Sequence, residues 1–303
     1  MRSSDCGMVQ KADPLPVYFS TGESLEMFRR MCLIRYFELN LKKAYDAGLM
    51  PKIPIYLSAG QETIASALSM IFPHAALFGQ HRCHDIYLAF GGNPIKLIDE
   101  LLGRPTGCAG GMGGSASIHS PEIRMFGHDG LMGSQVPIAV GYALGCGQKT
   151  IAFMGDASAE EGYVLGAIGY GATKKAPVLF VVCDNGLSIL TKTEVRRSWS
   201  MAQHAGFGTK TAEITDDPWL IMHYAKKLSD FLPALMNIHT CRMFWHAGTG
   251  KDGEPEWNRF ELVKQALSQL GLQHQSEMVE IYIKNYMDVL WQNRLKEGDN
   301  ERS

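Results

Sequence analysis

Two short apolar segments joined by a helical segment constrain the fold of this chain more than any other feature. The segment IAFM spans residues 151–154, and PVLFVVC spans 177–183. A turn, GDASAEEG, follows the first segment, and the residues from there to about Lys174 predict a helix. Short continuous apolar runs connected in this way are typical of buried parallel strands. We therefore expect a βαβ unit at the centre of an α/β fold.

Helical patterns precede and follow this unit. Ser20-x-x-Glu23 is a capping-box pattern, and the apolar residues that follow it recur at helical spacing until Gly48. Eight glycines between 107 and 134 favour a ligand-binding loop over a helix or strand. The helices expected outside the βαβ unit cover 20–48, 61–70, 94–102, 218–228 and parts of 257–295.

Charge and composition exclude several classes of protein. The 303 residues carry 29 Lys and Arg against 31 Asp and Glu, which leaves no whole-chain field to attract nucleic acid or a membrane surface. Seven scattered cysteines lack the C-x-x-C spacing of a zinc ribbon, and no signal peptide or membrane-spanning segment is evident. We expect a cytoplasmic protein with an N-terminal extension at 1–20 and one domain over 21–303, because no linker or repeat divides it.

Oxygen-bearing side chains follow both apolar segments. Asp156 comes after the first segment and Asn185 after the second. Because ligands of an open parallel sheet bind beyond the carboxyl ends of its strands, we expect the two side chains near one ion. A carboxylate, an amide oxygen and a backbone carbonyl would leave positions for water and a substrate phosphate, as Mg²⁺ usually requires. The structural alternative is that Asp156 caps the next helix and Asn185 lies in a turn with Gly186.

These residues resemble a known cofactor signature. GDA at 155–157 and DN at 184–185 are similar to the thiamine diphosphate motif, which is GDG followed by a pair of asparagines. The resemblance runs from about residue 25 to 290 and implies a thiamine diphosphate-binding fold, a doubly wound, mainly parallel sheet flanked by helices. Further motifs occur in the order found in α subunits of thiamine diphosphate-dependent 2-oxo acid dehydrogenases of the pyruvate, branched-chain and acetoin types: Gly60-Gln61-Glu62, Arg82-x-His84, Gly113-Gly114-Ser115 with His119, GSQVPIAVG at 133–141, and Arg242-x-x-x-His246.

The resemblance also implies which residues bind the metal and the diphosphate. Asp156, Asn185 and the carbonyl of Leu187 would hold Mg²⁺, and the amide of Ala157 would face the diphosphate. Arg82 would bind the diphosphate as well, since a guanidinium offers a fork of fixed donors to phosphate oxygens. The alternative for Arg82 is a surface ion pair.

Other positions would bind the ring and the substrate. Gly130 and Met132 fall where the family uses backbone groups to bind the aminopyrimidine ring. His246 would move a proton or stabilise charge on the substrate carboxylate, because imidazole titrates near neutral pH. His84 and His119 are further candidates for lining the site. The alternative for His246 is a solvated loop position.

The chain departs from the family pattern at several positions. Ala157 replaces the second glycine of GDG and is compatible with the diphosphate only if its φ is negative. Tyr56 lies where pyruvate-type members often have histidine, and Gln80-His81 departs from a family pattern that commonly has a tyrosine beside Arg82. The segment 191–203 resembles the mobile loop of the family, and its Arg196-Arg197 pair would bind a carboxylate or a partner, or form a solvated charge run.

The resemblance implies an α subunit that decarboxylates a small 2-oxo acid and transfers the acyl group to a lipoyl carrier. The glutamate that activates the aminopyrimidine lies on a separate β subunit in two-chain members, so we expect an α₂β₂ heterotetramer with a lipoyl acyltransferase as acceptor. Two alternatives remain open at this point. One is a two-chain carboligase or acyl-transfer enzyme of a specialised pathway, and the other is a non-catalytic thiamine-binding scaffold subunit.

Overall fold

The computed structural model describes residues 19–126, 130–248 and 253–300. The expected N-terminal extension at 1–20 therefore lies almost entirely outside the described residues, as does Gly127 of the glycine-rich segment. Within the described part, no helix is long and apolar enough to cross a membrane.

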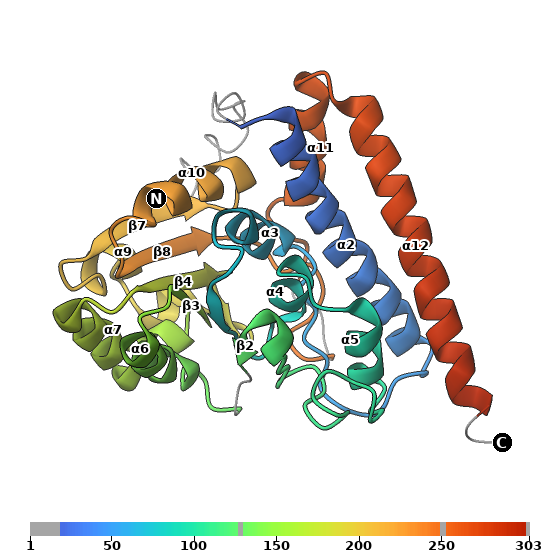
Figure 1. Ribbon diagram of the computed structural model, residues 1–303, viewed down its shortest axis with the longest axis horizontal. Coiled ribbons are helices and arrows are strands. Elements are labelled where there is room, and N and C mark those ends of the chain that lie inside the picture. The colour runs from blue at the N-terminus through green and yellow to red at the C-terminus, as the bar shows by residue number, and fades with distance from the viewer. Residues whose placement is uncertain (1–18, 127–129, 249–252, 301–303) are drawn as a thin grey trace.

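A parallel sheet forms the centre of the structure (Figure 1). Within the described residues it has six strands in the order β2-β1-β3-β4-β8-β7, and every neighbouring pair is parallel. This confirms the expected α/β class with a mainly parallel sheet flanked by helices. The strands are β1 (Ala76–Phe78), β2 (Met125–Phe126), β3 (Thr150–Gly155), β4 (Val178–Asp184), β7 (Lys210–Thr215) and β8 (Ala234–His239).

The predicted βαβ unit is present at the middle of this sheet. Strands β3 and β4 lie side by side, and the helix α7 (Gly162–Lys174) connects them. Side chains of both strands are buried on both faces, which explains why the sequence shows continuous apolar runs without alternation. A short 3-10 turn, η3 (Ser158–Glu160), separates the end of β3 from α7.

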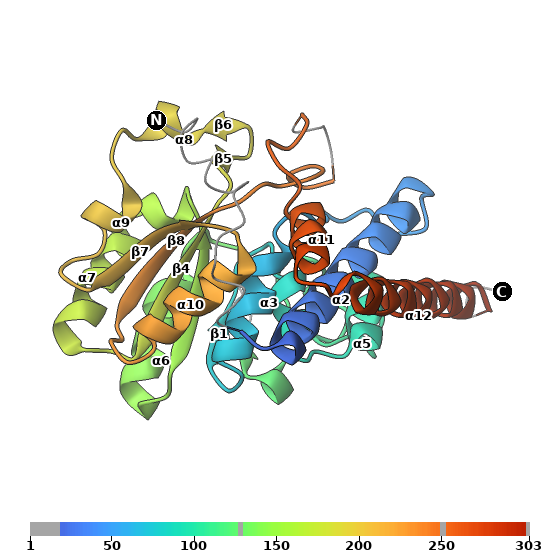
Figure 2. The same cartoon turned by 90° about the horizontal axis from the view of Figure 1, so that it is seen from above.

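Helices cover the two faces of the sheet in separate cores. Alternate residues of β3 divide between them, since Ile151 and Phe153 face one core and Ala152 and Met154 the other. The helices α6 (Gln135–Cys146), α7 and α9 (Met201–His204) pack in the smaller core. The helices α3 (Glu62–Ile71) and α10 (Pro218–Leu228) pack on the opposite face, as the view from above shows (Figure 2).

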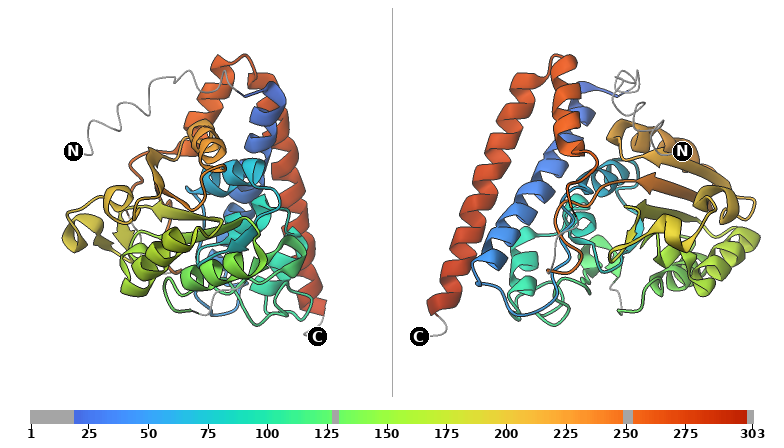
Figure 3. Two further views of the ribbon diagram at one scale, coloured as in Figure 1. Left: turned by 60° about the vertical axis from the view of Figure 1, so that its left-hand side comes forward. Right: turned by 180° about the vertical axis from the view of Figure 1, so that it is seen from behind.

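A layer of long helices lies beside the sheet, and Figure 3 shows it from two further sides. The helix α2 (Thr21–Asp46) begins with the predicted capping box, in which Ser20 and Glu23 bond each other's backbone amides. It packs along α12 (Gln273–Asn300), whose inner face buries Trp291 against Phe37. Three further helices complete this side: α4 (His84–Ala89), α5 (Pro94–Leu101) and α11 (Arg259–Gln269).

The glycine-rich segment differs in part from its prediction. Most of 107–124 forms turns, as expected, but Met125 and Phe126 form the edge strand β2. The segment also contains the short turn η2 (Pro121–Ile123). Four glycine and alanine amides of this segment bond the carboxylate of Glu100, which is fully buried. The expected ligand of these amides is therefore supplied by the protein itself at this point.

Candidate active site

A cavity of ≈ 260 Å³ lies beyond the carboxyl ends of β1, β3, β4 and β8. This edge of a parallel sheet is where such folds usually bind ligands. The residues that line the cavity come from the ends of these four strands, the loops that follow them, and three further segments: Tyr56, Gln61, Gln80, His81, Arg82, Ala116, Gly130, Met132, Gly155, Asp156, Ala157, Ser158, Cys183, Asn185, Leu187, Ser188, Ile189, Arg242 and His246.

Asp156 and Asn185 both line the cavity because of the strand register. Gly155 at the end of β3 pairs with Cys183 at the end of β4, so the residues that follow the two strands emerge together. The alternative that Asp156 caps the next helix is wrong, since neither η3 nor α7 has a side-chain cap. The turn expected for Asn185 is present, because its Oδ1 accepts the amide of Leu187 at 3.1 Å.

The oxygen ligands at this edge fit a hard divalent cation next to a diphosphate. Asp156 offers a carboxylate, Asn185 an amide oxygen and Leu187 a carbonyl, and all three residues line the cavity. The described residues hold no group of three or more His, Cys, Asp and Glu side chains that could bind a metal. Ala157 has φ −72°, and this negative φ is the one that we required for an alanine in the GDA turn.

The side chain of Asp156 is nearly fully buried, and its pKa is shifted. Burial and the negative charge of Asp184 raise the pKa of Asp156 to about 6, whereas Arg196 and the hydroxyl of Thr193 oppose that increase. The loss of hydration, which disfavours the charged carboxylate, therefore outweighs the attraction of the Arg196 guanidinium, which favours it. A carboxylate in such a position gains from a bound cation, because the cation favours its charged form.

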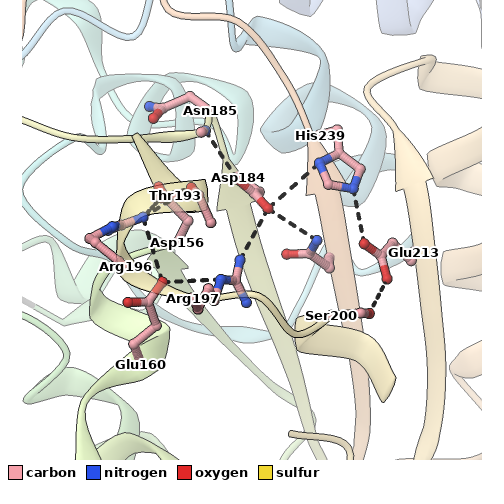
Figure 4. A network of polar contacts seen from close by, with 12 residues as sticks. Asp156, Glu160, Asp184, Asn185, Thr193, Arg196, Arg197, Ser200, Glu213 and His239 are labelled. Carbon is pink, nitrogen blue, oxygen red and sulfur yellow. Dashed lines mark hydrogen bonds and ion pairs between the residues drawn. The ribbon is translucent and has the colours of Figure 1, made fainter. Parts of the chain in front are cut away.

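Two arginines from the segment after β4 form ion pairs with the carboxylates of Asp156, Glu160 and Asp184 (Figure 4). Arg196 bonds Asp156 Oδ2 and lies 3.5 Å from Glu160, and the side chain is 15% exposed. Arg197 lies 3.1 Å from Glu160 and 3.3 Å from Asp184. The pair binds carboxylates of the chain itself, and the alternative of a solvated charge run is wrong, because the two side chains are 15% and 4% exposed.

The loop after β1 delivers three polar residues to the cavity. The Oε1 atom of Gln80 accepts the amide of Gly155 at 2.8 Å, which fixes the start of the turn that carries Asp156. Arg82 is buried and donates to the carbonyls of Leu57 and His246, the second at 3.0 Å. Its alternative as a surface ion pair is therefore wrong, since the guanidinium lies against the cavity wall.

Aromatic rings form the wall on the side of His246. The ring centroid of Tyr56 lies 4.7 Å from His81 and 5.6 Å from His246, and the two imidazoles are 5.5 Å apart. Arg242 lies 3.2 Å from Nδ1 of His246 and donates to the carbonyl of Ile189 at 2.7 Å. His246 is thus a lining residue of the cavity, in contact with its neighbours, and not a solvated loop residue.

Gly130 and Met132 line the same cavity from the segment that precedes α6. The hydroxyl of Tyr163 on α7 donates to the carbonyl of Met132 and holds this segment against α7. Gly133 follows with φ +83°, and a Cβ there would lie 2.5 Å from Cγ2 of Val164. Only glycine allows the chain to approach α7 this closely.

The other two candidate histidines lie outside the cavity lining. His84 is fully buried, with Nδ1 2.8 Å from Glu38 and Nε2 2.9 Å from the hydroxyl of Ser115. The same hydroxyl accepts the amide of Tyr56 at 2.8 Å, so this chain of hydrogen bonds supports the cavity wall from behind. His119 is exposed, and its ring packs 6.0 Å from Phe126.

Sequence reasoning missed some contributors to the site. Gln80 was noticed only as a departure from a family pattern, and Thr193 was not singled out, although its hydroxyl bonds Asp156 at 2.9 Å. The position of Gln80, two residues after the end of a strand, would have marked it, but β1 has only three residues and gives little signal. Thr193 belongs to a segment 37 residues away from Asp156, and no local pattern connects the two.

Comparisons with known proteins agree with this geometry. Residues 29–247 match the family model described as "Dehydrogenase E1 component". The chain is 34% identical to the pyruvate dehydrogenase E1 component subunit alpha of Zymomonas mobilis over 61% of this chain and 54% of that protein. It is 27% identical to the same subunit of Rickettsia bellii over 74% of this chain and 73% of that protein, and 30% identical to the testis-specific mitochondrial form of Rattus norvegicus over 82% and 66%.

The chain spans about half the length of the Zymomonas mobilis subunit. The matched region contains every lining residue of the cavity, from Tyr56 to His246. It also contains all strands of the parallel sheet. The chain belongs to the dehydrogenase E1 component family.

Proposed function

We propose that this chain is the α subunit of a two-chain thiamine diphosphate-dependent 2-oxo acid dehydrogenase. The observation that carries the proposal is the cavity at the ends of β3 and β4, where Asp156, Asn185 and Leu187 present oxygen ligands beside the turn of Ala157. This set suits Mg²⁺ bound to a diphosphate. Thiamine diphosphate is the cofactor of the family.

The residues of the cavity divide between cofactor and substrate. Asp156, Asn185 and the Leu187 carbonyl would hold Mg²⁺, and the Ala157 amide would face the diphosphate. Arg82 would contribute positive charge to the same group, because its guanidinium lies at the cavity wall. The backbone of the segment that includes Gly130 and Met132 would bind the aminopyrimidine ring.

The chemistry would then be shared between cofactor and protein. When bound, thiamine diphosphate supplies a carbanion and an electron sink for cleavage next to the carbonyl of a 2-oxo acid. His246 would donate a hydrogen bond to the substrate, and Tyr56 and His81 would exclude water on that side of the cavity. His84 would support the wall through Ser115, whereas the exposed position of His119 favours no catalytic role.

The active site would be completed by a second chain. In two-chain members the glutamate that activates the aminopyrimidine comes from a β subunit, and this chain would bind such a subunit in an α₂β₂ assembly. A lipoyl acyltransferase would accept the acyl group. Partner and cofactor would stabilise each other's binding, because both would contact the same folded site.

A second function keeps the cofactor and changes the acceptor. The presence of Tyr56 and His81 in the cavity wall, where the family pattern has other residues, favours a carboligase or acyl-transfer enzyme whose acceptor is not a lipoyl group. The two functions differ in one measurable property, which is the dependence of 2-oxo acid consumption on a lipoyl domain.

The test begins with the chain purified together with its partner in Mg²⁺ and thiamine diphosphate. A panel of 2-oxo acids is then assayed for CO₂ release with and without a lipoyl domain. Lipoyl-dependent release supports the proposed function. Release that is indifferent to the lipoyl domain favours the carboligase, and an assembled complex that binds the cofactor but releases no CO₂ from any 2-oxo acid favours a scaffold subunit.

A further inference from the structure

The segment that follows β4 folds back over the cavity as a strap, which we define as residues 187–197. It consists of the antiparallel hairpin β5 (Leu187–Ser188) and β6 (Thr191–Lys192) and the short helix α8 (Thr193–Arg196). The amide of Thr193 donates to the carbonyl of Gly186 at 2.9 Å, which closes the hairpin at its base. The strap carries Leu187 at one end and Arg196 at the other, so both belong to one continuous element.

The end of the strap is attached to a carboxylate of the cavity. Oδ2 of Asp156 accepts the hydroxyl of Thr193 at 2.9 Å and also accepts Nη2 of Arg196. The carboxylate side chain is 3% exposed, so water contributes little to its solvation. One oxygen of Asp156 thus receives two donors from the strap, one of them fully charged.

The same carboxylate belongs to the oxygen set that fits a divalent cation. A cation bound through Oδ2 of Asp156 would need the lone pairs that Thr193 and Arg196 use, and a cation bound through either oxygen would lie next to the positive guanidinium. A cation and a guanidinium that contact the same carboxylate repel each other strongly in a partly buried site. Arg196 and the cation therefore compete for Asp156.

Arg196 has a second partner within reach. Glu160, on the turn after β3, lies 3.5 Å from Nη2 of Arg196. Within the described structure, Nε and Nη1 of Arg196 are buried without a hydrogen bond, and Oε1 of Glu160 is buried with only ion pairs, the shorter of them to Nε of Arg197 at 3.1 Å. Guanidinium nitrogens and a carboxylate oxygen in that condition gain from a new hydrogen bond, so a transfer of Arg196 from Asp156 to Glu160 would satisfy both.

The rest of the strap has an independent anchor. Arg197 is bound by Asp184 and Glu160, stacks over the ring of Trp199 at 5.1 Å and does not contact Asp156. Release of Arg196 from Asp156 would therefore leave the strap tethered beside the cavity.

We propose that Arg196 is a built-in competitor of the divalent cation. It occupies Asp156 in one state of the strap and moves to Glu160 when the cation and the diphosphate bind. Cofactor loading and strap position are then coupled, because one carboxylate serves both. This inference rests on the proposed function, since it requires that Asp156 binds the cation of the cofactor.

The test is a cation titration of the assembled complex with its partner subunit. Mn²⁺ replaces Mg²⁺ as the probe, thiamine diphosphate is held in excess, and free Mn²⁺ is measured by electron paramagnetic resonance. The variant is Arg196→Gln, which removes the charge. The matched control is Lys192→Gln on the same strap, where the lysine is 70% exposed and lies 3.6 Å from Glu194.

We expect Arg196→Gln to bind Mn²⁺ about tenfold more tightly than the wild type, whereas Lys192→Gln is unchanged. Arg196→Lys keeps the charge and should keep wild-type affinity, which guards against a general effect of altering the strap. Equal or weaker binding by Arg196→Gln, in a complex that melts like the wild type, overturns the competition. If the wild type itself shows no saturable binding with thiamine diphosphate, the proposed function fails together with this inference.

Discussion

Nη1 of Arg242 lies 3.2 Å from Nδ1 of His246, and both side chains belong to the cavity wall. A guanidinium nitrogen can only donate a hydrogen bond, so Nδ1 of His246 is the accepting nitrogen. In the neutral ring the proton then resides on Nε2. Arg242 thereby fixes the tautomer of His246, and the donation of Arg242 to the Ile189 carbonyl fixes the guanidinium itself.

Replacement of Arg242 by methionine should reduce turnover by about 10²-fold, because His246 loses its fixed tautomer and orientation. Arg242→Lys retains a donor and should recover part of the rate. Nitrogen chemical shifts of His246 provide a second measurement, in which the wild type shows the Nε2–H form and Arg242→Met a mixture of both forms. A wild-type rate in Arg242→Met would contradict this role.

Gly133 should not tolerate alanine. Its φ of +83° disfavours a side chain, and the new Cβ would lie 2.5 Å from Val164. We expect Gly133→Ala to lower the free energy of unfolding by about 1–3 kcal/mol. The control variant is Gly141→Ala. Gly141 lies inside α6, and no atom lies within 4 Å of the position of a new Cβ, so this variant should unfold no more easily than the wild type. Denaturant melts of both variants measure the difference.

Asp85 should make the stability of the chain depend on pH. Burial raises the pKa of Asp85 to about 7, although the hydroxyl of Ser58 donates to it at 3.0 Å. The pKa of Asp85 is higher in the folded state than in the unfolded chain. The contribution of Asp85 to the free energy of unfolding is therefore fully present below the unfolded pKa of about 3.8 and is lost as the pH rises through 7.

The variant Asp85→Asn remains neutral at every pH and keeps an acceptor for Ser58. Its melting temperature should therefore exceed that of the wild type at pH 8, with a difference that shrinks steadily towards pH 5. The exposed Asp230→Asn serves as control and should show no such trend. A difference that is constant across this range would show that burial does not perturb Asp85.

The strands at the centre of the sheet and the start of α2 were predicted well from the sequence, because residues close together in the chain determine them. Strands β3 and β4 are buried on both faces, which produces continuous apolar runs, and Ser20 and Glu23 specify the start of α2 between themselves. Strand β7 was missed because it lies at the edge of the sheet and alternates exposed and buried residues that include Lys210 and Glu213.

Without the family resemblance, the candidate site was predictable only where residues follow strands directly. Asp156 and Asn185 do so, and the strand register brings them together. The contact of Arg196 with Asp156 depends on a segment that folds back over the cavity, and the contact of His84 with Glu38 joins residues 46 positions apart. Such contacts arise from the packing of distant elements, which no local sequence pattern records.

The most direct test of the account is thiamine diphosphate binding by the chain in complex with its partner subunit, measured by calorimetry in Mg²⁺ for the wild type, Asp156→Asn and Asp230→Asn. Loss of an outer contact of a metal site typically costs 10–100-fold in affinity, so we expect loss of the Asp156 carboxylate itself to weaken binding by more than about 100-fold. Asp230→Asn should bind as the wild type does. Unchanged affinity in Asp156→Asn would contradict the assignment of this cavity as the cofactor site.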